Sequence, residues 1–136
     1  MKLVRNEILY RNSFILIELN YDEDCMCVNW RGYVSHHDVM AGCMEILRLV
    51  KEHKVVDILN DNTYVEGMWS GAAKWGGEFW FPALREAGLQ RFAWIYSPSM
   101  LSRLSTDKTI KHTPTPDYIK TFDDIEEAKD WLRTTC

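Results

Sequence analysis

Apolar and polar positions along the chain predict strands that alternate with amphipathic helices. Residues 14–19 form an apolar run of strand length, rich in β-branched and aromatic side chains, and residues 25–30 alternate like a second strand. The acidic turn between them, residues 21–24, is short, so the two strands are expected to pair as an antiparallel hairpin that Gly32 ends. Residues 1–10 are expected to add a short strand at the edge.

A long helix and a buried strand are predicted after the hairpin. Apolar residues recur at helical spacing over residues 36–53, and Ser35 stands three residues before Asp38, as an N-capping residue does. Residues 55–59 have the composition of a buried strand. This strand is expected to run out into a polar loop, Asn60-Asp61-Asn62-Thr63-Tyr64.

A second long helix is expected over residues 68–87, with Gly88 placed to end it in a left-handed conformation. Pro82 lies inside this span. Because proline removes one helical hydrogen bond and clashes with the preceding turn, a kink or break is expected near residues 78–82. The pair Gly76-Gly77 in the same helix indicates close packing against a neighbour rather than a phosphate-binding loop.

The rest of the chain predicts two further strands and two further helices. In chain order these are a strand at 91–96, a short helix after Ser97-Pro98 that carries Met100, Leu101 and Leu104, a loop at 105–117, a strand at 118–122 and a helix capped by Asp123. The loop is expected to be the most mobile segment. Together the elements predict the α/β class: one domain over residues 1–136, with a mostly parallel sheet, an antiparallel N-terminal hairpin at its edge and about four helices.

Composition and charge narrow the class of protein. With 136 residues, 46% of them hydrophobic and 26% charged, the chain has the composition of one globular domain with one core. A net charge of -4 argues against nucleic-acid binding, which needs a basic face. No leader peptide and no stretch of ~20 apolar residues is visible, so a cytoplasmic protein without a membrane span is expected.

The cysteines indicate neither a disulfide framework nor a clear metal site. Cys25, Cys27, Cys43 and Cys136 show no C-x-x-C spacing, so reduced cysteines packed in the core are expected, with metal ligation by the first three and a histidine as the alternative. A G-x-S-x-G elbow, a P-loop and a G-x-G-x-x-G fingerprint are all missing from the sequence. No catalytic residue, metal or cofactor is therefore predicted, and the chain is expected not to be an enzyme.

Two stretches of the chain carry a family resemblance. They are Ser97-Pro98 followed by Arg103-Leu104, and the ending Thr121-Phe122-Asp123-Asp124 that continues through Glu127-Ala128 to Trp131-Leu132. With the order of elements, they resemble the STAS domain of anti-sigma-factor antagonists and sulfate-transporter tails, and most closely its SpoIIAA-like (STAS/SEC14-type) branch. The resemblance covers residues 14–134 and implies the STAS fold and a regulatory, protein-binding module.

The resemblance also implies a place for a phosphorylation switch. In the antagonist proteins an Asp-Ser-Ser-Gly motif at a helix start is phosphorylated by a partner kinase, which adds charge at an interface. Here Ser70-Gly71 matches the end of that motif, whereas Met68 and Trp69 stand where the aspartate and the phosphoacceptor would be. Ser70 and Thr63 are the nearby hydroxyl groups and are the candidate phosphoacceptors.

The second long helix carries more aromatic surface than one sheet face buries. Trp69 falls on its main apolar stripe and is expected in the core. Met68, Trp75 and Phe79 lie together on a flank, and Phe81 points nearly opposite the stripe. Either the kink shifts the phase so that the rim of the core absorbs these rings, or they form an exposed patch of the kind that marks an interface.

Two functional hypotheses follow from this helix. In the first, the chain binds a protein partner, or a second copy of itself as a homodimer, through the 68–87 helix and the loop before it. In the second, a small apolar or lipid-like ligand lies beneath that helix, and the kink and the 105–117 loop form its gate. The candidate partner- or ligand-binding residues are Asp61, Asn62, Thr63, Met68, Trp69, Ser70, Trp75 and Phe79.

Overall fold

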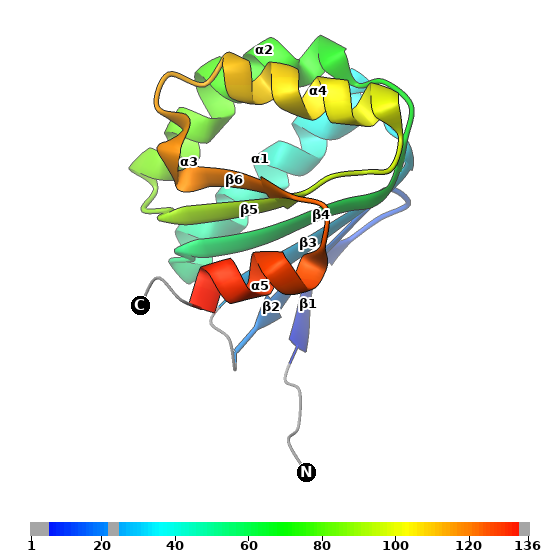
Figure 1. The fold of residues 1–136 in the computed structure, drawn as a ribbon. Helices are drawn as coiled ribbons and strands as arrows, with labels where there is room; N and C mark the ends of the chain where they lie inside the picture. The colour runs from blue at the N-terminus through cyan, green and yellow to red at the C-terminus, as the bar shows by residue number, and fades with distance from the viewer. Residues whose placement is uncertain (1–5, 22–24, 134–136) are drawn as a thin grey trace.

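The computed structural model describes residues 6–21 and 25–133, which form a six-stranded sheet with helices on both faces (Figure 1). The strands are β1 (Asn6–Arg11), β2 (Ile15–Asn20), β3 (Cys25–Tyr33), β4 (Asp57–Glu66), β5 (Arg91–Ile95) and β6 (Ile119–Phe122). The helices are α1 (His36–His53), α2 (Ala73–Trp75), α3 (Phe81–Glu86), α4 (Met100–Lys111) and α5 (Ile125–Arg133). Shorter turns are the 3₁₀ turns Ser70–Ala72 and Pro116–Tyr118 and the π-helical turn Gly76–Trp80.

The sheet is mixed, and its strands follow one another in space as they do in the chain. β1, β2 and β3 pair antiparallel, whereas β3, β4, β5 and β6 pair parallel. Figure 1 shows α1 to α4 on one face of the sheet and α5 on the other. The predicted α/β fold and its N-terminal hairpin are confirmed. The predicted edge strand is found at Asn6–Arg11, while residues 1–5 and 22–24 lie outside the described residues.

Two hydrophobic clusters hold these layers together, one on each face of the sheet. In β5, Phe92 and Trp94 pack in the cluster beneath α1 and α3, whereas Ala93 and Ile95 pack in the cluster beneath α5. Side chains alternate between the faces of a strand, so a strand that is covered on both sides is apolar throughout. This explains why the central strands appear as continuous apolar runs in the sequence.

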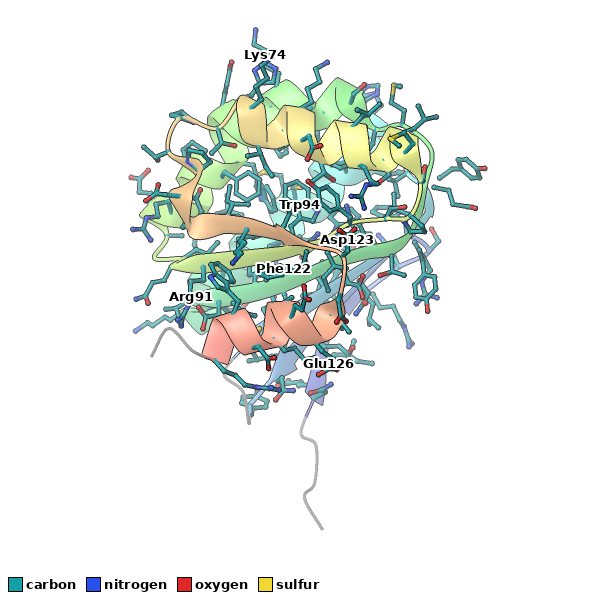
Figure 2. All side chains as sticks on the ribbon, in the orientation of Figure 1. Lys74, Arg91, Trp94, Phe122, Asp123 and Glu126 are labelled. Atoms are coloured by element: carbon teal, nitrogen blue, oxygen red, sulfur yellow. The ribbon has the colours of Figure 1, made fainter. Side chains whose placement is uncertain are left out.

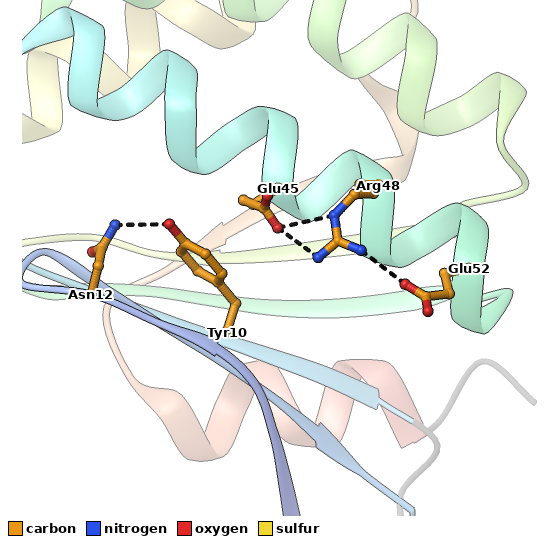
Figure 3. A network of polar contacts seen from close by, with 5 residues as sticks. All are labelled: Tyr10, Asn12, Glu45, Arg48 and Glu52. Carbon is orange, nitrogen blue, oxygen red and sulfur yellow. Dashed lines mark hydrogen bonds and ion pairs between the residues drawn. The ribbon is translucent and has the colours of Figure 1, made fainter.

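Helix α1 begins and ends where its sequence predicts. The Ser35 hydroxyl accepts a hydrogen bond from the Asp38 amide at 3.0 Å, and the Asp38 carboxylate accepts one from the Ser35 amide at 3.1 Å, which completes a capping box. On the outer surface, Arg48 pairs with Glu45 and Glu52 (Figure 3). Such exposed pairs add little stability.

No helix within the described ranges is both long enough and apolar enough to cross a membrane.

Strand β4 corrects one prediction. Residues 60–64 were expected in a loop, yet they belong to β4, which extends to Glu66. The register against β3 shifts between Asn29 and Arg31, where β4 holds one more residue than its neighbour. Asn60 and Asn62 are two residues apart and face the same side of the sheet, and both are buried. The polar run resembles a loop in sequence because its amides find hydrogen-bonding partners only in the folded chain.

Strand β3 is longer than predicted, although its antiparallel pairing with β2 ends at Trp30, before Gly32 as expected. The strand continues through Gly32 to Tyr33. Gly32 has a φ of 81°, a conformation that glycine adopts without the steric cost that other residues meet. The glycine therefore lies within an element that goes on, because pairing with β4 continues from Arg31 through Gly32 to Tyr33.

The predicted second helix is a broken segment, residues 70–86, which we call the 70–86 segment. It passes from a 3₁₀ turn through α2 and the π-helical turn into α3. The predicted break is confirmed, and its physical form is the π turn that precedes Pro82. The π turn holds one residue more than an α-helical turn, so it rotates the side chains that follow it about the helix axis. Phe81, expected opposite the apolar stripe, is therefore fully buried. Gly88 has a φ of 109°, as predicted for the end of the helix.

Helix α4 corrects the predicted loop at 105–117. The helix continues to Lys111, and its buried residues are Ser102, Ser105, Thr106 and Thr109. Its apolar residues Met100, Leu101 and Leu104 are exposed. Ser105 Oγ and Thr109 Oγ1 donate to carbonyls one turn earlier, those of Leu101 at 3.0 Å and of Ser105 at 2.9 Å, whereas Thr106 Oγ1 has no hydrogen-bond partner among the described residues. Because this helix buries hydroxyls and exposes leucines, its hydrophobic pattern does not reveal it.

The two stretches that carry the family resemblance meet in space. Arg103 on α4 pairs with Asp123, just after β6, at 2.6 Å, and its guanidinium lies 4.0 Å from the centre of the Tyr96 ring. Ser97 Oγ donates to the Val65 carbonyl at 2.6 Å, which ties the end of β5 to the end of β4. These residues fix the carboxyl edge of the parallel strands.

Candidate functional site

A cavity of about 40 Å³ lies between the sheet and the 70–86 segment. Residues of three strands, of α1 and α4 and of the 70–86 segment form its wall. They are Trp30, Val34, Val39, Cys43, Asn60, Asn62, Val65, Trp69, Ala72, Trp75, Gly76, Trp80, Phe92, Trp94 and Thr109. Five of the six tryptophans of the chain are in this set, and none of its members carries a charged side chain.

Three indole N–H groups of the cavity wall have a hydrogen-bond acceptor, whereas that of Trp94 has none among the described residues. Trp30 Nε1 donates to Asn60 Oδ1 at 2.9 Å, Trp69 Nε1 to Ser102 Oγ at 3.2 Å, and Trp80 Nε1 to the Cys43 carbonyl at 2.7 Å. Trp94 Nε1 is buried and has no hydrogen-bond partner among the described residues. Figure 2 places Trp94 between the sheet and α4.

Two amide side chains form the polar part of the cavity wall. Asn60 Nδ2 donates to Asn62 Oδ1 at 3.1 Å, while Asn60 Oδ1 accepts from Trp30. The β4 bulge places Val65 on the same wall, although Val65 lies three residues, an odd number, beyond Asn62. The strand thus supplies both polar and apolar parts of one wall.

Cys43 lies on the α1 side of the cavity and is buried. Burial raises the pKa of its thiol well above the ordinary value, because a thiolate would lose its water without gaining a counter-charge. The neutral thiol keeps the cavity uncharged at neutral pH. Cys43 is a free thiol, and the described residues hold no cluster of three or more metal-ligating side chains.

Trp75 is one of the partly exposed residues of the cavity wall. Trp75 is half-buried and packs against the core, and its ring lies 5.6 Å from that of Phe79. Phe79 is 48% exposed and Met68 is 57% exposed. The flank expected from the sequence is therefore divided between the cavity wall and the surface.

The structure separates the candidate binding residues into three groups. Asn62, Trp69 and Trp75 meet at the cavity, and Met68 and Phe79 lie on the surface. Asp61 and Thr63 bond to each other: the Asp61 carboxylate accepts from the amide of Thr63 at 2.9 Å and from its hydroxyl. Ser70 is half-buried at the start of the 3₁₀ turn. As consecutive residues of a strand, Asp61 and Asn62 face opposite sides of the sheet.

Sequence reasoning missed several cavity residues, among them Trp30, Asn60 and Trp94. Trp94 alternates with Ala93 and Ile95 in a predicted strand, so the sequence places it on the same side as Phe92. Nothing in that pattern says which side encloses a cavity. The 70–86 segment decides this, because its tryptophans close over the strand only in the tertiary structure.

Comparison with known proteins places the chain in a family. A family model described as SpoIIAA-like matches residues 25–133. Among solved structures, the chain is similar to an uncharacterised protein of the DUF3478 family with a SpoIIAA-like fold from Shewanella loihica PV-4. The two are 23% identical with a TM-score of 0.52, over 91% of this chain and 98% of that chain, which shows the fold alone. No curated protein matches the chain.

Proposed function

The chain belongs to the SpoIIAA-like family, whose members are typically regulatory binding modules, and we propose that it binds a small apolar ligand in the cavity beneath the 70–86 segment. One observation carries this proposal: most of the tryptophans of the chain form the wall of a single uncharged cavity. Pockets for small molecules are concave, mostly apolar and furnished with a few polar groups. The module acts by binding and not by catalysis, and the buried, reduced thiol of Cys43 suits a reducing cytoplasm.

The cavity is too small to admit a ligand unless the structure around it opens. At about 40 Å³ it is smaller than an apolar cavity of about 150 Å³, which accommodates benzene. Binding therefore requires outward movement of the 70–86 segment. This segment is suited to such movement, since it mixes 3₁₀, α and π hydrogen-bonding patterns, and π turns occur frequently at functional sites. In this proposal the gate is the 70–86 segment together with α4.

Filling the cavity is expected to abolish binding. Ala72 lines the cavity, so Ala72→Leu places a larger apolar side chain where the ligand would lie. Native mass spectrometry of freshly purified protein is expected to show a co-purifying small mass in the wild type and at least about tenfold less in Ala72→Leu, a loss of about 1.4 kcal/mol in binding.

The control for this experiment adds the same side chain elsewhere. Ala41 is exposed on α1, and Ala41→Leu is expected to retain the bound mass of the wild type. Circular dichroism checks that both variants are folded. Equal bound fractions in all three proteins, or a wild type that binds neither a co-purified molecule nor added apolar probes, would contradict the proposal.

A second candidate function is binding of a protein partner or of a second copy of the chain. The observation that favours it is the exposure of Met68 and Phe79, together with Leu101 and Leu104 of α4. Met68 lies beside α4, because the next residue, Trp69, donates its backbone N–H to Ser105 Oγ at 3.1 Å. Contiguous exposed apolar groups are typical of interaction surfaces.

The double variant Met68→Ser, Phe79→Ser tests this second candidate. If the chain self-associates through these residues, the dimer dissociation constant measured by sedimentation velocity is expected to rise at least about tenfold. The free energy of unfolding should change by less than about 0.5 kcal/mol per site, because exposed side chains contribute little to stability. A wild type that sediments as a monomer at the highest concentration tested would rule out self-association.

A further inference from the structure

The hydrogen-bonding capacity of the cavity wall is unbalanced. The indole N–H groups of Trp30, Trp69 and Trp80 all have acceptors, whereas the N–H of Trp94 has none among the described residues. Trp94 is only 4% exposed, so water outside the protein does not reach this group freely. A buried donor without an acceptor lowers stability, since it loses its hydration and gains nothing in return.

The amide oxygens of the cavity side chains are already engaged, and the Thr109 hydroxyl donates within α4. Asn60 Oδ1 accepts from Trp30, Asn62 Oδ1 accepts from Asn60, and the Cys43 carbonyl accepts from Trp80. An indole N–H is a donor and never an acceptor. What the wall offers beyond its internal bonds is therefore a donor, and its complement is a molecule that brings an acceptor.

We propose that the ligand of this cavity is a neutral, flat, mainly apolar molecule with one hydrogen-bond acceptor, such as a ring carbonyl, which takes the N–H of Trp94. This inference rests on the proposed function and specifies the chemistry of the same site. Trp94 positions the ligand, and the remaining tryptophans supply apolar contact.

The electrical neutrality of the ligand follows from the wall. None of the cavity residues is charged, and the Cys43 thiol is protonated. A charged group in such a site would lose its hydration without a counter-charge, which strongly opposes binding. An ionised carboxylate or phosphate is therefore expected not to enter.

The flat shape follows from the arrangement of the rings. Trp69 and Trp94 lie with ring centres 6.0 Å apart and an angle of 22° between their planes, and Trp94 lies 5.5 Å from Phe92 at 75°. Aromatic rings pack favourably in offset-stacked or edge-to-face arrangements, so walls of this kind select planar molecules. The cavity volume of about 40 Å³ favours a compact ring system over a long acyl chain.

A pair of matched probes tests the assigned acceptor. Indane and 1-indanone share one bicyclic skeleton, and only 1-indanone carries a carbonyl. Isothermal titration with the full chain measures the dissociation constants of both probes for the wild type and for Trp94→Phe. The ratio of the indane constant to the 1-indanone constant is expected to fall about fivefold in Trp94→Phe, the size of one net hydrogen bond.

Trp80→Phe is the matched control. The Trp80 ring also lines the cavity, but its N–H already donates to the Cys43 carbonyl. The ratio of the two constants in this variant is expected to stay within about twofold of the wild type. A purely structural effect of removing a tryptophan would change the ratio in both variants alike.

The outcomes separate this inference from the proposed function. If both probes bind and Trp94→Phe leaves their ratio unchanged, the inference is overturned and the ligand-binding proposal stands. If neither probe binds the wild type, both fail together. Should Trp94→Phe not fold, the indole N–H resonance of Trp94 in ¹⁵N-labelled wild type decides: a downfield shift with 1-indanone and none with indane supports the inference, and equal responses overturn it.

Discussion

Replacing Phe81 with alanine is expected to destabilise the protein by about 3–5 kcal/mol, whereas Phe79→Ala is expected to cost less than about 1 kcal/mol. Phe81 is fully buried, and its ring centre lies 4.9 Å from that of Phe92 and 5.6 Å from that of Trp94. Its removal leaves a void that close-packed aromatic neighbours fill poorly. The measurement is the free energy of unfolding from urea denaturation of both variants.

The comparison of these two phenylalanines tests the π turn itself. The residues are two positions apart, and only the extra residue in the turn brings Phe81 rather than Phe79 into the core. In an uninterrupted α-helix over the same residues, Phe81 would lie on the side away from the sheet. Equal losses of stability in the two variants would show that the helix runs without the π turn.

Gly77→Ala is expected to destabilise the protein by about 1–3 kcal/mol, although alanine has the higher helix propensity. A Cβ at this position would lie 2.5 Å from the Thr109 carbonyl oxygen and 2.7 Å from His112 Cβ. Both contacts are with α4, whose backbone cannot yield without displacing the helix. The loss is measured as a lower free energy of unfolding in urea.

Gly76→Ala is the matched control for this second variant. Its Cβ would meet the Thr109 methyl group at 3.2 Å, a contact that small adjustments relieve. The gain in helix propensity, about 1 kcal/mol, is expected to offset that contact and leave stability nearly unchanged. A neutral Gly77→Ala would mean that the 70–86 segment and α4 separate easily, and the close approach of the two would then contribute nothing to the fold.

The close approach at Gly77 also bears on ligand access. α4 packs against the 70–86 segment through serines and threonines, and Ser105 and Ser102 hold Trp69 by its backbone and side-chain N–H groups. Hydrogen bonds of this kind are directional and each contributes only about 1 kcal/mol net. Near α4 the start of the segment is held by a few such bonds, whereas Trp80, Phe81 and Leu84 pack deep in the core, so opening is expected to begin on the α4 side.

The sequence predicted the elements whose local patterns agree with their surroundings. Helix α1 was predicted within its observed bounds because its capping box and its apolar stripe are both local features. The hairpin and the parallel strands followed from apolar runs and short connections. The break before Pro82 was predicted because the chemistry of proline acts on the four residues that precede it.

The cavity could be predicted only in part. Asn62, Trp69 and Trp75 were named as binding residues, and all three line the cavity. Trp94 was not named, because its role depends on the hydrogen bonds of the other tryptophans rather than on its own strand. The division of the aromatic flank, with Trp75 at the cavity and Phe79 at the surface, depends on a phase shift that periodicity does not contain.

By itself the sequence determined the order of strands and helices, the α/β class and the strongly apolar character of residues 68–87, since each depends on neighbours along the chain. Only the tertiary structure decided that Asn60 and Asn62 are strand residues, that the hydroxyl face of α4 is buried and that Phe81 is in the core. The physical reason is the same in all three cases. A polar group is buried when the folded chain supplies its hydrogen-bond partners, one turn away in α4 and 30 residues away for Asn60 and Trp30. A ring is buried when the backbone turns it toward the core, so neither outcome can be read from hydrophobicity along the chain.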